Sequence, residues 1–168
     1  VSFEGIQGQL TDHYDPSGHV VRLSEGIATQ PSVAALAIVA HELGHAQQHQ
    51  ENSPLIALRQ FLVPAMRFSP TAAYFLIFLG FIMNATGLIQ LGILFFTIVV
   101  GFMLLTLPVE FDASRRGMIL LREADLFSAE QDRNGSRAIL TAAAMTYVAA
   151  FVSSLLTLLY YISLLNRR

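Results

Sequence analysis

Three residues in this chain have the types and the spacing to hold a metal ion and to use it in catalysis. His41, Glu42 and His45 form the pattern His-Glu-x-x-His within the mostly apolar run 33–46. On an α-helix, residues four apart lie on the same face, so the two imidazoles could bind a single metal ion. The glutamate between them would then be placed to act as a base toward a metal-bound water. This interpretation requires a helix over the motif and a third metal ligand elsewhere in the chain.

The composition indicates a membrane protein. Of the 168 residues, 54% are hydrophobic and only 13% are charged, which departs from the composition of soluble domains. All ten basic residues are arginines and none is clustered with aromatic residues, so we expect no nucleic-acid partner. Because the chain has no cysteine, any metal must be held by histidine and carboxylate. The chain begins at Val1 without a signal pattern, so we expect a processed or truncated piece.

The residues around the motif predict a β-hairpin followed by a helix. Turn-forming residues at 15–18 separate two short strands and predict a hairpin over 8–23. Pro31 and Ser32 are typical of a helix start, and the apolar face that follows predicts a helix over 31–50. The motif therefore falls on a half-buried helix with a polar C-terminal end.

Two long apolar segments follow. Residues 70–107 contain no charged residue, and we divide them at 84–87 into a hairpin of two transmembrane helices, with a partly re-entrant hairpin as the alternative. Residues 54–67 form a connector, either amphipathic at the membrane surface or a soluble linker helix. Residues 138–165 predict a third transmembrane helix. We therefore expect a single, mainly α-helical, multi-pass membrane domain over 1–168, with about three transmembrane helices and a small β-hairpin.

The order of these segments places the motif and the charged segment 108–137 on one side of the membrane. Two spans return the chain to the side that it left. Seven arginines near the spans lie on the motif side, and two lie at the far end of the chain. The positive-inside rule then predicts that the motif side is cytoplasmic, in the cell (inner) membrane.

Glu110 is the preferred third ligand. It stands where the second span emerges on the motif side, between Val109 and Phe111, and a carboxylate in that place needs a partner. A metal ion would supply the partner, whereas the simpler interpretation is a surface carboxylate paired with Arg115 or Arg116. The rival ligand is the nearby acidic residue at 112.

The chain contains three other histidines, at positions 13, 19 and 49. His49 lies eight residues after His41, a rise of about 12 Å along a helix, whereas metal–nitrogen bonds are about 2 Å long. His13 and His19 belong to the hairpin and could bind only if it folds over the site. We expect ordinary hydrogen-bonded histidines at these positions.

Two further residues could support the ligands. Ser114 lies one turn after Glu110 and could donate a hydrogen bond to a metal ligand. Asp112 is a second candidate for a residue that hydrogen-bonds to a ligand. The sequence does not identify the group that would stabilise an oxyanion, and the candidates are Tyr147, His13 and Arg115.

Four segments of the chain resemble the YugP-type neutral zinc metallopeptidases of bacterial membranes. They are Leu-Thr-Asp-His-Tyr-Asp-Pro at 10–16, His-Glu-Leu-Gly-His at 41–45, Leu-Pro-Val-Glu-Phe-Asp-Ala-Ser-Arg-Arg at 107–116 and Thr-Tyr-Val-Ala-Ala at 146–150. More distantly, the arrangement is similar to the minimal gluzincin core of HtpX-type and CAAX prenyl proteases. In the HtpX-type segment an aspartate stands where this chain has Ser114, and YugP-type proteins begin with a further membrane helix and a soluble helix.

The resemblance implies a fold, a cofactor and a set of roles. It implies a Zn²⁺ ion bound by His41, His45 and Glu110, with Glu42 as the base. It also implies that an extended polypeptide substrate pairs with the edge formed by Leu10, Thr11, Asp12 and His13.

The sequence as a whole predicts a membrane-bound zinc metalloendopeptidase. Its partners would be the lipid bilayer and membrane or membrane-associated polypeptides, cleaved on the cytoplasmic side. One alternative is a site-2-type intramembrane protease, in which the motif lies inside a spanning helix. The other is a non-catalytic membrane scaffold with a structural metal site. The polar end of the motif helix argues against the first alternative, and the intact Glu42 argues against the second.

Overall fold

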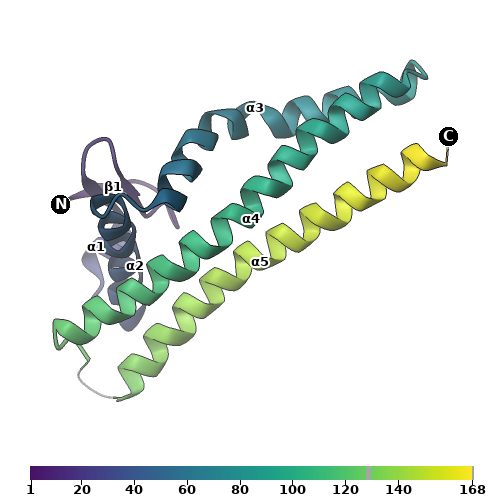
Figure 1. Cartoon of the computed structure of the whole chain (residues 1–168). Coiled ribbons are helices and arrows are strands. Elements are labelled where there is room, and N and C mark those ends of the chain that lie inside the picture. The colour runs from purple at the N-terminus through teal and green to yellow at the C-terminus, as the bar shows by residue number, and fades with distance from the viewer. Residues whose placement is uncertain (128–129, 168) are drawn as a thin grey trace. The chain divides into compact units, whose positions relative to one another are not determined.

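The computed structural model describes residues 1–127 and 130–167 and shows a mainly helical chain with one small sheet (Figure 1). In these residues there are three strands and five helices in the order β1-β2-β3-α1-α2-α3-α4-α5. The strands are β1 (Ser2–Ile6), β2 (His13–Asp15) and β3 (Val20–Ser24). The helices are α1 (Glu25–Thr29), α2 (Val33–Gln50), α3 (Pro54–Ile82), α4 (Thr86–Glu123) and α5 (Glu130–Asn166).

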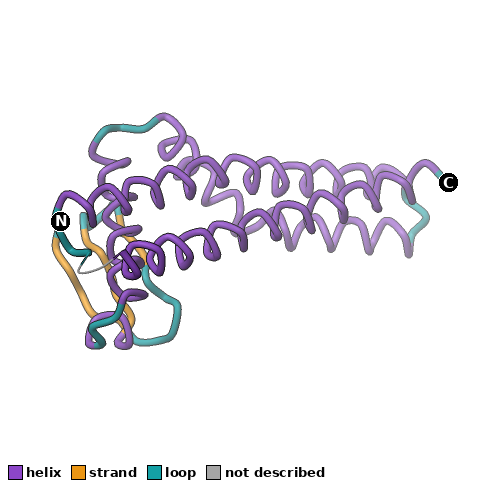
Figure 2. Tube along the Cα trace, turned by 90° about the horizontal axis from the view of Figure 1, so that it is seen from below, coloured by secondary structure: helices purple, strands orange, loops and turns teal. Residues whose placement is uncertain are grey.

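The sheet contains the predicted hairpin and one strand that was not predicted. The strands, drawn orange in Figure 2, have the order β1-β3-β2, and β2 is antiparallel and β1 parallel to the central strand β3. Arg22 of β3 joins all three strands, because it pairs with Glu4 of β1 at 3.1 Å and with Asp15 of β2 at 2.6 Å. The hydrogen bond from Arg22 lowers the pKa of Asp15, which keeps this carboxylate charged. The first strand of the hairpin is shorter than predicted and begins at His13.

The motif lies on α2, as predicted. Ser32 caps this helix by accepting a hydrogen bond from the Ala35 amide at 3.1 Å. The helix ends at Gln50, with Glu51 as its C-cap. The predicted start at 31 is two residues early, because the extended residue Ser32 precedes the first helical residue, Val33.

Three helices are long and apolar enough to cross a membrane, namely α3, α4 and α5. The turn between α3 and α4 falls at 83–85, next to the predicted break at 84–87. All three helices extend beyond the predicted spans. The connector 54–67 is the first part of α3, α4 continues through Pro108 to Glu123, and α5 begins at Glu130. The change from apolar to charged residues is therefore not the end of a helix. It divides each helix into a part apolar enough to span a membrane and a more polar part.

Proline lies inside two of these helices. Pro64 and Pro70 lie within α3, and Pro108 lies within α4. A proline removes one hydrogen bond from a helix, and its ring crowds the preceding turn, so a helix that contains it tends to bend. Figure 1 shows α3 bent along its length.

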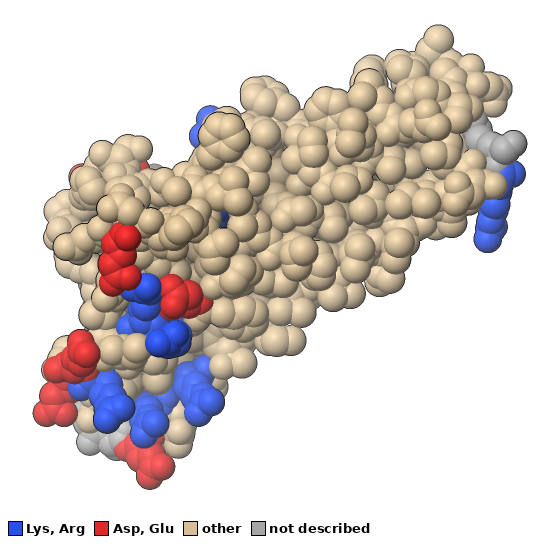
Figure 3. Space-filling model, in the orientation of Figure 1, with Lys and Arg blue, Asp and Glu red and all other residues tan. Residues whose placement is uncertain are grey.

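The chain divides into two compact units. One comprises Val1–Ile56 and Pro108–Met145, and the other comprises Ala57–Leu107 and Thr146–Arg168. The second unit packs its helices around Ala73, Phe96, Val100 and Leu158. On the face seen in Figure 3, most charged side chains gather over the first unit. This unit contains the sheet, the motif helix and the Glu110 segment.

In the first unit α2 and α4 cross at very close range. A Cβ atom added to Gly44 of α2 would collide with the backbone of Ala113 of α4. A Cβ atom added to Gly117 of α4 would lie 2.9 Å from the carbonyl group of Ala40 of α2. The two glycines therefore allow backbone contact between the helix of the motif and the helix of Glu110.

This crossing predicts that Gly117→Ala lowers stability. The added methyl group has to push the two helices apart, at a cost of about 1–3 kcal/mol. Thermal unfolding of the purified chain in detergent measures the effect. The matched control is Gly26→Ala in α1, where an added Cβ meets nothing within 4 Å. Equal melting temperatures for the two variants would show that the crossing is not tight.

Candidate metal centre

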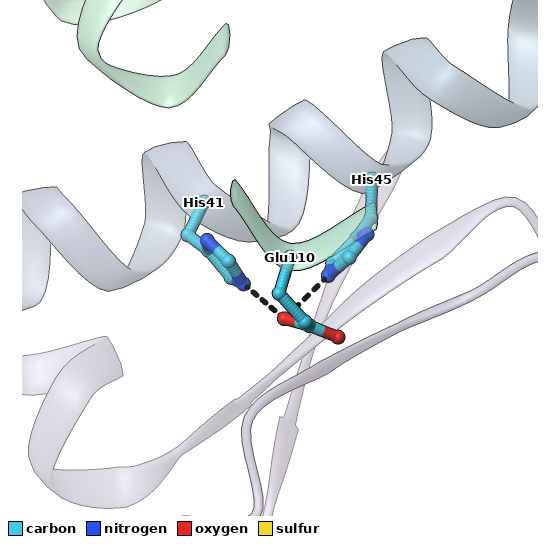
Figure 4. Close-up of side chains that lie close together, drawn as sticks. All are labelled: His41, His45 and Glu110. Carbon is cyan, nitrogen blue, oxygen red and sulfur yellow. Dashed lines mark hydrogen bonds and ion pairs between the residues drawn. The ribbon is translucent and has the colours of Figure 1, made fainter. Parts of the chain in front are cut away.

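His41 and His45 of α2 and Glu110 of α4 direct their side chains toward one point (Figure 4). Oε2 of Glu110 lies 3.2 Å from Nε2 of His41 and 3.5 Å from Nε2 of His45. One potential ligand atom from each residue lies within 4.8 Å of the others. Over residues 1–127 and 130–167, this is the one group of three or more such side chains that could hold a metal ion.

The chemistry of these three residues fits zinc. Two imidazole nitrogens and one carboxylate oxygen are the donors of a common class of catalytic zinc site, which keeps a further position for water or substrate. Glu110 is only 2% exposed, and a buried carboxylate is costly unless positive charge compensates it. A divalent cation between the three side chains would supply that charge.

The helical path of α4 beyond Pro108 brings Glu110 to the site. Buried residues recur along this segment every three or four positions, at 110, 113, 117 and 121, and form the face that meets α2. Ser114 lies one turn after Glu110, and its Oγ is 3.1 Å from Nδ1 of His41. The serine therefore contacts the ring nitrogen of His41 that faces away from Glu110, and its role in supporting a ligand stays a prediction.

Asp112, the rival ligand, lies outside the metal-binding group. Its Oδ2 accepts hydrogen bonds from Arg116 at 2.7 Å and from the side-chain amide of Gln48 at 2.9 Å. Arg116 also pairs with Glu51 at 2.8 Å. Arg116, one of the two arginines expected as alternative partners of Glu110, is thus paired with two other carboxylates.

Gln48 is a residue at the site that the sequence reasoning missed. Its side chain is buried, and its Oε1 lies 3.0 Å from Nδ1 of His45. The signal was present, because a polar residue three positions after His45 lies next to it on the helix surface.

Glu42 is buried beside the edge strand of the sheet. It is 8% exposed, and its Oε2 accepts a hydrogen bond from the backbone amide of Tyr14 in β2 at 2.8 Å. The free edge of the three-stranded sheet therefore lies against the motif helix at the residue expected to act as base.

The remaining histidines lie outside the metal-binding group. The hydroxyl of Tyr14 lies 3.1 Å from Nδ1 of His19 and 3.3 Å from Nδ1 of His49. Burial, and then the charge of Asp15, raise the pKa of Tyr14, so its hydroxyl stays protonated and can donate to one of the two rings. Nδ1 of His13 instead lies 2.7 Å from the carbonyl oxygen of Thr11.

The segment expected to bind substrate is only partly a strand. Of its four residues, His13 belongs to β2, whereas Leu10 is highly exposed with a positive φ of 56°. Asp12 accepts hydrogen bonds from the backbone amide and the hydroxyl of Ser24, and the Thr11 hydroxyl lies near the carbonyl of Gln7. The substrate-binding role of this segment stays a prediction.

Comparison with known proteins identifies the family. The family described as "putative neutral zinc metallopeptidase" matches residues 1–166. The chain belongs to this family. It is also 43% identical over 170 residues to the "putative membrane protease YugP" of Bacillus subtilis (strain 168), and the match covers all of this chain and 75% of the relative. No solved structure matches the chain significantly.

Membership of this family identifies the cofactor. The family is one of zinc metallopeptidases, and His41, His45 and Glu110 are positioned to bind a metal ion. Zinc is accordingly the metal expected at this centre, and the three apolar helices agree with a membrane protein.

The geometry predicts different zinc contents for two neighbouring variants. Glu110→Gln removes the carboxylate charge at the centre, and the purified protein should contain much less than one zinc per chain. Asp112→Asn alters a residue outside the metal-binding group and should keep close to one. Elemental analysis after dialysis against a weak chelator measures both. A higher zinc content in Glu110→Gln than in Asp112→Asn would instead identify Asp112 as the ligand.

Proposed function

We propose that this chain is a membrane-bound zinc metalloendopeptidase that cleaves membrane or membrane-associated polypeptides. The observation that carries the proposal is the convergence of His41, His45 and Glu110 beside the buried carboxylate of Glu42. A structural zinc site has no need of such a carboxylate, because its ligands fill the coordination sphere. The family and the printed name of the Bacillus relative support the same activity.

The residues have distinct roles in this reaction. Bound zinc would lower the pKa of a water molecule and polarise the peptide carbonyl. Glu42 takes up the proton that the attacking water loses and delivers it to the nitrogen of the departing amine. The hydrogen bond from the Tyr14 amide holds this carboxylate in place on the side of β2.

The free edge of β2 is the proposed site of substrate binding. In the sheet order β1-β3-β2, only one side of β2 is paired with a neighbouring strand. On the other side the Tyr14 amide donates to Glu42, so an extended polypeptide that replaces this hydrogen bond could add to β2 next to the proposed base. Cleavage of extended or locally unfolded segments follows from this mode of binding.

The proposal includes an orientation in the membrane. Spans α3 and α4 would return the chain to one side, so residues 1–53 and the Glu110 segment would share the cytoplasm. Glu110 follows the end of the uncharged stretch 70–107 by three residues, which favours a site close to the membrane surface. The excess of arginine on the same side supports this orientation.

The two alternatives are less well supported. A site-2-type intramembrane protease would carry its motif in a spanning helix, yet the candidate spans in the described part of the chain are α3, α4 and α5, and α2 has a polar end. A scaffold with a structural metal would not require the buried Glu42.

The role of Glu42 predicts that Glu42→Gln keeps zinc and loses activity. The amide cannot take up a proton, and general acid–base catalysis is worth about 10²–10⁴-fold in rate. Cleavage of an unfolded protein such as casein by the purified chain, together with its zinc content, measures both effects. Gln50→Glu, an exposed change on the same helix, is the matched control. Wild-type cleavage by the zinc-loaded Glu42→Gln variant would refute the catalytic assignment.

The orientation predicts the labelling of single cysteines. The chain has no cysteine, so Met83→Cys in the α3–α4 turn and Ser17→Cys in the β2–β3 turn each introduce one thiol. A membrane-impermeant maleimide should label Met83→Cys in intact cells and Ser17→Cys only after lysis. Labelling of the Ser17→Cys protein in intact cells would reverse the orientation.

A further inference from the structure

Gln48 connects a metal ligand on α2 with the backbone and a carboxylate of α4. It is 1% exposed, and a buried side-chain amide is stable only where its polar atoms are hydrogen-bonded. We propose that Gln48 is a positioning residue that fixes which ring nitrogen of His45 carries the proton, and so presents the other nitrogen to zinc. This inference rests on the proposed metal site and does not depend on peptidase activity.

The orientation of the Gln48 amide is set by its neighbours on α4. Its Nε2 lies 2.9 Å from the carbonyl oxygen of Val109 and 2.9 Å from Oδ2 of Asp112. A carbonyl oxygen accepts hydrogen bonds only, and so does a carboxylate that is ion-paired with an arginine, as Asp112 is with Arg116. Both amide hydrogens are therefore used on α4, and the amide oxygen must face His45.

This orientation decides the tautomer of His45. Oε1 of Gln48 can only accept, and it lies 3.0 Å from Nδ1 of His45, so Nδ1 carries the proton. In a neutral imidazole the lone pair is then on Nε2, the nitrogen that lies 3.5 Å from Glu110. Metal binding requires this lone pair. If the tautomer is already fixed, no free energy is spent on converting the other tautomer when the metal binds.

The Nδ1 contact of the other histidine ligand does not fix the position of a proton in this way. Nδ1 of His41 faces the hydroxyl of Ser114, which can either donate or accept a hydrogen bond. Its contact is therefore compatible with both neutral tautomers of His41. Gln48 is the partner that places the proton of His45 on Nδ1, and it is anchored through Asp112 and Arg116 to Glu51.

The inference is tested with Gln48→Met, which keeps a similar length and removes the acceptor. In the zinc-free full chain in detergent micelles, the ¹⁵N signals of the His45 ring should change from a single Nδ1–H tautomer to a mixture. The zinc dissociation constant, measured by competition with a chelator, should increase about 10–100-fold. Gln50→Met, an exposed change two residues later, should leave both quantities unchanged.

A second pair of variants keeps the test decisive if Gln48→Met does not fold. Gln48→Glu retains an acceptor for Nδ1–H of His45 but loses both donors and places a second carboxylate beside Asp112. Adding Asp112→Asn removes that repulsion and restores a donor, so the double variant should bind zinc more tightly than Gln48→Glu alone.

Two results would overturn the inference. One is an unchanged His45 tautomer in folded Gln48→Met, and the other is loss of the Nδ1–H tautomer in Gln48→Glu with Asp112→Asn, which keeps an acceptor for that proton. Neither measurement uses a peptide substrate. Failure of the peptidase proposal would therefore leave both results interpretable, and failure of this inference would leave the peptidase proposal standing.

Discussion

The contact between the backbones of α2 and α4 is the constraint on which the metal centre depends. Gly44 and Gly117 have no side chains, and their absence lets the two helices meet where any larger residue would separate them. Gly44 immediately precedes His45, and Glu110 lies one turn before Ala113, the residue that Gly44 contacts. The three proposed ligands can therefore converge only while this crossing is intact. A metal–ligand distance tolerates an error of only about 0.2 Å. Any change that separates α2 from α4 would therefore also weaken metal binding.

A second requirement is that the buried polar side chains between α2 and α4 find hydrogen-bond partners within the protein. Each ligand histidine has a partner on its outer nitrogen, and these partners lie on both helices. A series of contacts runs from His45 through Gln48 and Asp112 to Arg116. It ends at the partly exposed Glu51, which pairs with Arg116. The centre is thus bordered by oriented hydrogen bonds and by the two ion pairs of Arg116, while a backbone amide of the sheet donates to Glu42. Interactions that hold the helices together also orient the groups that would do the chemistry.

Much of this arrangement follows from sequence patterns, and the exceptions have physical reasons. The motif helix, its Ser32 cap and the break near residue 84 depend on local signals, so they were predictable. The gathering of His41, His45 and Glu110 was predictable because an isolated carboxylate at the end of a span needs a partner. Strand β1 was not predicted, because its parallel pairing with β3 depends on contacts distant in sequence. A helix bearing Glu110 was predicted, but its continuity with the second span through Pro108 was not, because a proline and a change of polarity usually accompany a helix end. Gln48 was overlooked because a glutamine in a polar helix end looks like a surface residue until its partners on α4 are known.

X-ray absorption spectroscopy at the zinc edge of the purified full chain measures the proposed coordination of the metal directly. We expect one zinc per chain, bound by two imidazoles at about 2.0–2.1 Å with oxygen ligands completing the shell. The signal of the second imidazole should disappear in His45→Ala. A zinc shell with a single imidazole in the wild-type chain, or an unchanged shell in that variant, would show that His41 and His45 do not bind the metal together.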